Sequence, residues 1–79
     1  MKKNPYLAKT LVEVVENQLR SGDPAIVRET LERLMCNGHD RDNAVRLIST
    51  ALIKEIQAVL QTQEPYDSFR YRALLEALE

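Results

Sequence analysis

Apolar residues recur along this chain at helical rather than strand spacing. They return every three or four positions in three stretches, within 7–19, 27–35 and 44–60. This is the period of an amphipathic helix, whereas a strand buried on one face alternates strictly between apolar and polar residues. The pattern therefore predicts helices at about 5–20, 24–37 and 41–62, followed by a shorter one at about 68–78.

Residues typical of helix ends lie between these stretches. Asp23-Pro24 combines a capping residue with a proline, which is well tolerated in the first turn of a helix. Gly38 is expected to end the second helix, because glycine readily adopts the backbone conformation found just past a helix end. Asp40 and Asp67 are the expected N-caps of the third and fourth helices.

The 41–62 stretch is expected to be the centre of the fold. Its apolar residues cover more than half of the helix circumference, and such a helix is usually contacted from several sides. They are Ala44, Val45, Leu47, Ile48, Ala51, Leu52, Ile53, Ile56, Val59 and Leu60. We therefore predict an all-α fold, a compact bundle of three main helices plus a short C-terminal one, in a single domain spanning 1–79.

Glu55 lies inside this apolar arc, where a carboxylate is costly unless it is paired. Two interpretations are open. In the more common arrangement the side chain sits at the edge of the arc and reaches solvent or one arginine. In the other it forms a buried structural ion pair with Arg41 or Arg72, or bonds to the hydroxyl of Tyr66 or Tyr71, and so fixes how the last helix docks.

The composition is that of an ordinary globular protein, with 44% apolar and 29% charged residues. The net charge is -1, so no overall field attracts nucleic acid or anionic lipid. No run approaches the roughly 18 apolar residues of a membrane span, and no signal-peptide core is present. The expected location is the cytoplasm.

Glu29 and Arg33, one turn apart on the second helix, are expected to pair.

Cys36 and His39 have the spacing of half a zinc site. Zinc needs three or four protein ligands, and the chain has no second cysteine or histidine, so only a symmetric dimer could complete the set. A thiol nucleophile with a histidine base would also need a third, orienting group that the sequence does not supply. We therefore predict no catalytic residue, no metal ligand and no cofactor, and no enzymatic activity.

Several arginines raise the alternative of a small nucleic-acid-binding regulator. Four of them would form its surface: Arg41, Arg46, Arg70 and Arg72. Phe69 and Tyr71 alternate with the last two, but the favoured interpretation is that these aromatics anchor the terminal helix to the core. Asp40 and Asp42 open the third helix and would repel phosphates, and the basic footprint of a nucleic-acid-binding domain is missing.

The second turn resembles the Met-Gly-Phe loop of ubiquitin-associated domains. Met35 and Gly38 correspond to the first two residues of that loop, and a helix with alanine and leucine at similar offsets follows. In this chain Cys36-Asn37 lies between them, and His39 stands where the aromatic residue belongs.

A second resemblance extends over nearly the whole chain from residue 4. It is to an uncharacterised family of small bacterial all-helical proteins that share four features: an Asp-Pro helix start, a Gly-His-x-Arg-x-x-Ala-x-x-x-Ile segment, a Leu-x-x-Glu-Ile segment, and a Pro-Tyr-Asp ending that leads to a tyrosine. Here these features lie at 23–24, 38–48, 52–56 and 65–71. The resemblance implies a helical fold and a bacterial origin, and it implies no activity. Members often carry histidines where this chain has Asp42 and Arg46, so a ligand role of those histidines does not carry over.

The function that the pattern favours is a non-enzymatic protein–protein interaction module. A chain of this length has few elements with which to cover apolar residues that lie off the main helical stripes, and uncovered apolar patches mark interfaces. The candidates are Ile26, Ile53, Leu60 and Phe69. The expected partner is a second copy of the chain, in a homodimer, or an unidentified protein, with no role for a membrane.

Overall fold

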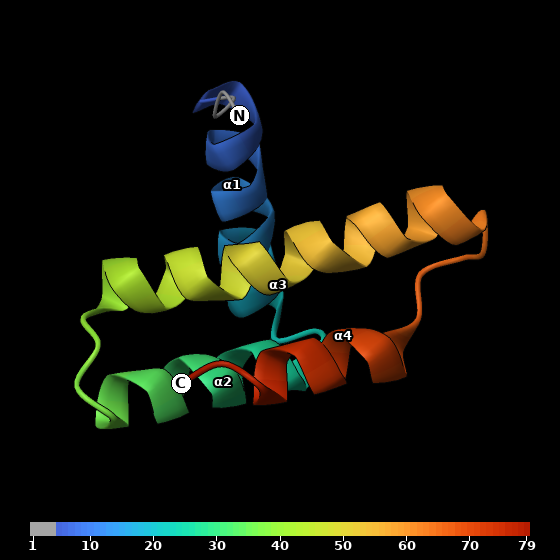
Figure 1. The fold of residues 1–79 in the computed structure, drawn as a ribbon. Helices are drawn as coiled ribbons and strands as arrows, with labels where there is room; N and C mark the ends of the chain where they lie inside the picture. The colour runs from blue at the N-terminus through green and yellow to red at the C-terminus, as the bar shows by residue number, and fades with distance from the viewer. Residues whose placement is uncertain (1–4) are drawn as a thin grey trace.

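The chain folds into four helices joined by short connections (Figure 1). The computed structural model describes the backbone of residues 5–79 and the side chains of residues 9–79. The helices are α1 (Pro5–Ser21), α2 (Ala25–Cys36), α3 (Arg41–Thr62) and α4 (Ser68–Glu76). The described residues contain no strand, which confirms the predicted all-α class and the order of its elements.

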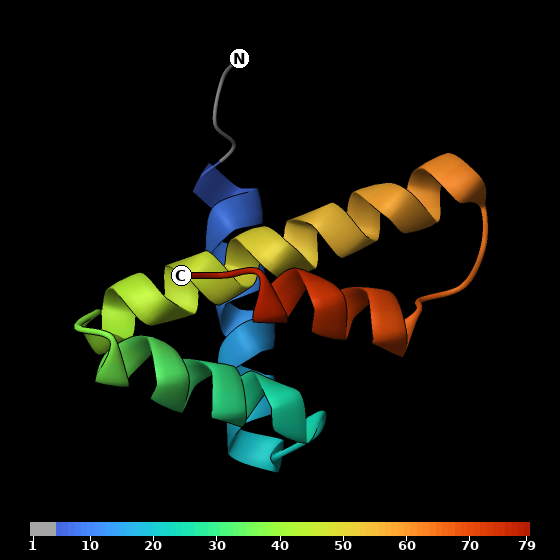
Figure 2. The ribbon, with the colours of Figure 1, turned by 60° about the horizontal axis from the view of Figure 1, so that its bottom comes forward.

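The long helix α3 is the central element, as its wide apolar arc predicts. It contacts each of the other three helices. α1 crosses α3 steeply, whereas α2 and α4 both run back in the direction opposite to α3 (Figures 1 and 2). Short connections permit either antiparallel or steeply crossed neighbours, and this fold uses both.

The core is formed by one face of each helix around α3. The buried apolar residues are Leu11, Val15, Leu19, Val27, Leu34, Ala44, Val45, Ile48, Ala51, Leu52, Tyr71 and Leu75. Tyr71 is the largest fully buried side chain, and its hydroxyl donates to the Gln18 side-chain oxygen at 3.1 Å. The expectation that Tyr71 anchors the last helix is confirmed, and its hydroxyl also bonds that helix to α1.

Two of the three predicted aspartate caps are present. Asp40 accepts from the Asn43 N–H at 2.8 Å, and Asp67 caps the first turn of α4. The prediction for Asp23 is wrong: Pro24 occupies the N-cap position of α2, without a side-chain cap bond. The Asp23 main chain instead closes the tight turn, its N–H bonding to the Ser21 hydroxyl at 3.3 Å.

Arg33 fastens the C-terminal end of α4 to α2. Its guanidinium donates to the carbonyl of Leu78 at 2.6 Å and to that of Leu75 at 2.9 Å. Carbonyls at the end of a helix lack partners within the helix and carry its negative dipole end, so a cation there is favourable. The predicted pairing of Arg33 with Glu29 is therefore wrong, because the guanidinium has better acceptors across the interface.

The end of α3 is closed by Gln63 in the left-handed conformation, with φ of 57°. Its N–H donates to the Val59 carbonyl at 2.9 Å. Glycine is the usual residue at such a position, because a Cβ is disfavoured there.

Gln63→Gly is expected to raise the free energy of unfolding by about 0.5–1 kcal/mol, since relief of the left-handed strain exceeds the added entropy of the unfolded chain. Urea unfolding monitored by circular dichroism measures the change. Gln61→Gly, inside the last turn of the same helix, is the matched control and should destabilise by about 0.5–1 kcal/mol. Equal losses in both variants would contradict the prediction.

Candidate functional site

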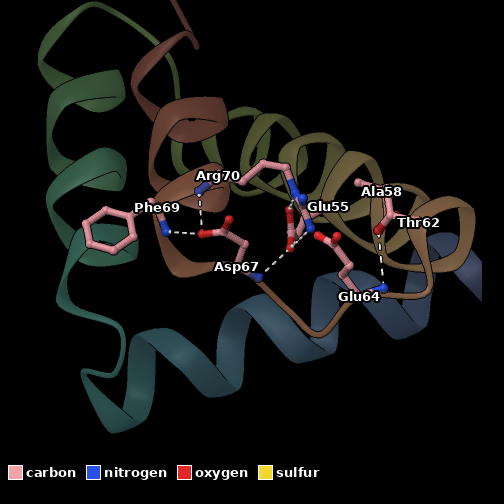
Figure 3. Close-up of polar contacts among 7 residues, drawn as sticks. All are labelled: Glu55, Ala58, Thr62, Glu64, Asp67, Phe69 and Arg70. Atoms are coloured by element: carbon pink, nitrogen blue, oxygen red, sulfur yellow. Dashed lines mark hydrogen bonds and ion pairs between the residues drawn. The ribbon is translucent and has the colours of Figure 1, made fainter.

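A buried carboxylate on α3 holds the start of α4 in place. The Glu55 side chain is 1% exposed. Its Oε1 accepts from Arg70 Nε at 2.5 Å, and its Oε2 accepts from Arg70 Nη2 at 3.0 Å and from the Asp67 N–H at 2.9 Å (Figure 3). Glu55 is therefore not at the edge of the arc, and its desolvation is offset by three donors.

The arginine in this pair is not one of the two expected from the sequence. Arg41 lies fourteen residues before Glu55, which is roughly 20 Å along one helix, and it forms a bidentate pair with Glu16 of α1 at 2.7 and 2.8 Å. Arg72 pairs with Glu76 on the surface of α4 at 3.3 Å. Arg70 is the residue of α4 that faces Glu55 of α3. Arg70 and Arg72 both adjoin the buried Tyr71 in sequence, so adjacency to that tyrosine could not select between them.

Asp67 extends the network from the core to the first turn of α4. Its N–H is held by Glu55, while its own Oδ1 accepts from the N–H groups of Phe69 at 2.9 Å and Arg70 at 3.2 Å (Figure 3). The first turn of α4 is thus positioned by a continuous series of bonds that begins at a buried charge. We call Glu55, Asp67 and Arg70 the Glu55 network.

The hydrogen bonds from Arg70 lower the pKa of Glu55 below its ordinary value of 4.5. Burial acts in the opposite direction, and the Asp67 N–H adds to the lowering. The carboxyl is therefore ionised at neutral pH, and the same contact raises the pKa of Arg70.

The side chain of Phe69 is exposed to solvent, although its backbone N–H is bonded to Asp67 of the Glu55 network. It is 82% exposed, and it points away from Glu55 and toward α2 (Figure 3). The expectation that Phe69 anchors the last helix is therefore wrong, and Tyr71 alone has that role. A large aromatic in such a position leaves most of its apolar surface in water.

Phe69 forms one side of an open groove of about 250 Å³ between α2 and α4. We call this the α2–α4 groove, and its lining residues are Pro24, Ala25, Ile26, Glu29, Tyr66, Ser68, Phe69 and Arg72. The Tyr66 ring packs edge-on against the buried Tyr71 ring, with 5.9 Å between centroids, so the groove is tied to the core. Ile26, half-buried beside α4, brings a second expected interface residue to the same surface.

The other two expected interface residues lie elsewhere. Leu60 is 73% exposed on the end of α3 that projects past the other helices (Figure 1). Ile53 is partly buried against the core. Three helices contact α3, so more of its circumference is covered than two neighbours would cover.

The four arginines of the nucleic-acid alternative come from α3 and α4. Three of them are each bonded to a glutamate: Arg41 to Glu16, Arg70 to Glu55 and Arg72 to Glu76. Arg46 is exposed on α3.

Cys36 and His39 lie at the exposed turn between α2 and α3. Cys36 is exposed, and the His39 Nε2 lies 2.7 Å from the main-chain oxygen of Glu79. Among the described residues, no three histidine, cysteine or acidic side chains come together as metal ligands. None of the described helices combines the length and the apolar character that a membrane crossing requires.

Glu55→Gln is expected to lower the free energy of unfolding by about 1.5–3 kcal/mol, because a charged acceptor of three bonds is lost. The amides of α4 should exchange with solvent faster than those of α1. Glu16→Gln is the matched control, since it removes the exposed pair with Arg41 and should cost less than about 1 kcal/mol. Chemical denaturation with hydrogen exchange distinguishes them, and equal effects of the two variants would contradict a special role for Glu55.

Acidification is expected to remove the contribution of Glu55. Its pKa is lower in the folded than in the unfolded chain, so its stabilisation is fully present above pH 4.5 and is lost as the pH falls through the lowered pKa. The difference in unfolding free energy between the wild type and Glu55→Gln should shrink from about pH 5 to about pH 2. Urea titrations along this pH range measure the difference in unfolding free energy. A difference that stays constant with pH would mean that the charge of the Glu55 carboxylate is not the source of the stabilisation.

Searches of protein-family models, curated proteins and solved structures with this chain return no match.

Proposed function

We propose that this chain is a non-enzymatic protein–protein interaction module whose contact surface is the α2–α4 groove. The observation that carries the proposal is the exposure of Phe69 on a helical turn that the Glu55 network fixes in place. The groove is lined by apolar side chains together with two charged ones, Glu29 and Arg72. Protein interfaces commonly combine apolar contacts with charged and polar groups.

The position of Phe69 suits it to be an anchor for a partner. A phenylalanine can bury roughly 150–250 Å² of surface, and a few such anchors carry most of the energy of a typical interface. Ordering flexible groups on binding costs affinity, and a turn that is already held by Asp67 avoids part of that cost. The Glu55 network therefore supports binding without touching the partner.

The pairing of arginines with glutamates supports a protein partner rather than a nucleic-acid partner. Arg41 and Arg70 are each held by two bonds to a glutamate, and a phosphate would have to displace those carboxylates. The net charge of -1 supplies no field to favour that exchange.

A photo-crosslinking residue, p-benzoylphenylalanine, placed at position 69 is expected to form protein adducts in the producing cells. The matched control carries it at position 46, where Arg46 is exposed on α3 outside the groove. Adding Glu55→Gln to the position-69 protein should lower the adduct yield, because the network that orients the first turn of α4 is weakened. Adduct yields at position 69 that do not exceed those at position 46, measured on denaturing gels, would overturn the proposal.

A further inference from the structure

We infer that the partner of the α2–α4 groove is a second copy of this chain, related by a two-fold axis that runs along the groove. In this arrangement Glu29 of one copy pairs with Arg72 of the partner subunit. The inference rests on the proposed function, and it adds the identity and orientation of the bound partner.

The charges that the two helices bring to the groove are the first support. Glu29 comes from α2 and Arg72 from α4, so one bordering helix brings an acidic side chain to the groove and the other a basic one. Glu29 makes no hydrogen bond or ion pair with any residue in the described part of the chain. Arg72 has a single 3.3 Å bond to Glu76, between side chains that are both more than half exposed. Both charges are thus accessible to a partner.

Symmetry turns this charge pattern into self-complementarity. A two-fold axis along the groove places α2 of each copy over α4 of the other, because the rotation exchanges the two bordering helices. The acidic side chain then faces a basic one on both sides of the axis, and two Glu29–Arg72 pairs form. The apolar lining residues meet between these pairs, with Phe69 of each copy packing over the start of α2 of the other copy. An unrelated partner would have to match this charge order by coincidence.

The overall electrostatics agree with such a pairing, and the size of the groove sets its expected strength. A net charge of -1 leaves almost no long-range repulsion between copies. A standard interface takes about 800 Å² from each partner, a modest share of the 5808 Å² exposed by this chain. The groove alone is smaller than that, so a reversible dimer is expected, with a dissociation constant in the micromolar range or weaker.

Sedimentation equilibrium from about 1 μM to about 1 mM tests the inference on the intact chain. The wild type should approach twice the 9.1 kDa monomer mass as concentration rises. Glu29→Arg and Arg72→Glu should each weaken the dimer at least about tenfold, because each places like charges together twice. The double variant Glu29→Arg/Arg72→Glu should return the dissociation constant to within about threefold of the wild type, since the pairs re-form with reversed sign.

Arg46→Glu is the control, because Arg46 is exposed on α3 and does not line the groove, and it should leave the dimer unchanged. Circular dichroism shows whether each variant remains folded. A wild type that stays monomeric to 1 mM, or a double variant that stays as weak as the single ones, would overturn the inference. If the wild type stays monomeric and the crosslinker at position 69 captures a different protein, the dimer inference is wrong but the proposed function is retained. If the wild type stays monomeric and no adduct forms, both the dimer inference and the proposed function are wrong.

Discussion

The carboxylate of Glu55 lies inside the apolar core, and a charge in that place needs partners from the protein itself. Arg70 and the Asp67 N–H supply them, and both belong to the start of α4 or the connection before it. The position of α4 is thus coupled to the satisfaction of a buried charge. An apolar residue at position 55 would remove the desolvation cost, but it would also remove the directional constraint that selects one docking of α4.

A helix as short as α4 cannot hold itself together in water, because nine residues lie well below the length at which isolated helices persist. Its stability comes from contacts with the rest of the fold at three points. The Glu55 network fixes its first turn, Tyr71 and Leu75 bury its middle, and Arg33 binds its last carbonyls. These contacts join α4 to residues distant in sequence, so its stability depends on the rest of the fold.

This mode of attachment separates the two faces of α4. Arg70, Tyr71 and Leu75 attach α4 to the rest of the fold, whereas Phe69 and Arg72 line the groove beside α2. The proposed contact surface therefore spans α2 and α4. Contacts on the side of α4 away from the groove fix the position of that helix. Rigidity of this kind matters for a small module, because its limited surface can give useful affinity only if little entropy is lost on binding.

The sequence alone determined the helices of this protein and the central place of α3, because these follow from local features. Apolar periodicity set the helix positions, and Asp40 and Asp67 marked two starts correctly because a side-chain cap depends only on neighbouring backbone. The exposure of Leu60 was also predicted, since it lies off the main apolar stripe, but the same reasoning named Ile26 and Ile53, which are partly buried. For Phe69 the sequence supported two opposite expectations, a core anchor and an exposed contact residue, and only the structure decided between them.

The tertiary structure decided which charged groups meet. Arg70 rather than Arg41 or Arg72 pairs with Glu55. Arg33 bonds to the carbonyls of Leu75 and Leu78 and not to Glu29. These pairings depend on the rotation of α4 about its own axis and on the path of the connection at 63–67, which sets the position of its first turn. Long side chains can reach partners several ångströms away in any direction, so spacing along one helix does not select among them. Only the packed arrangement places Glu55 and the first turn of α4 together.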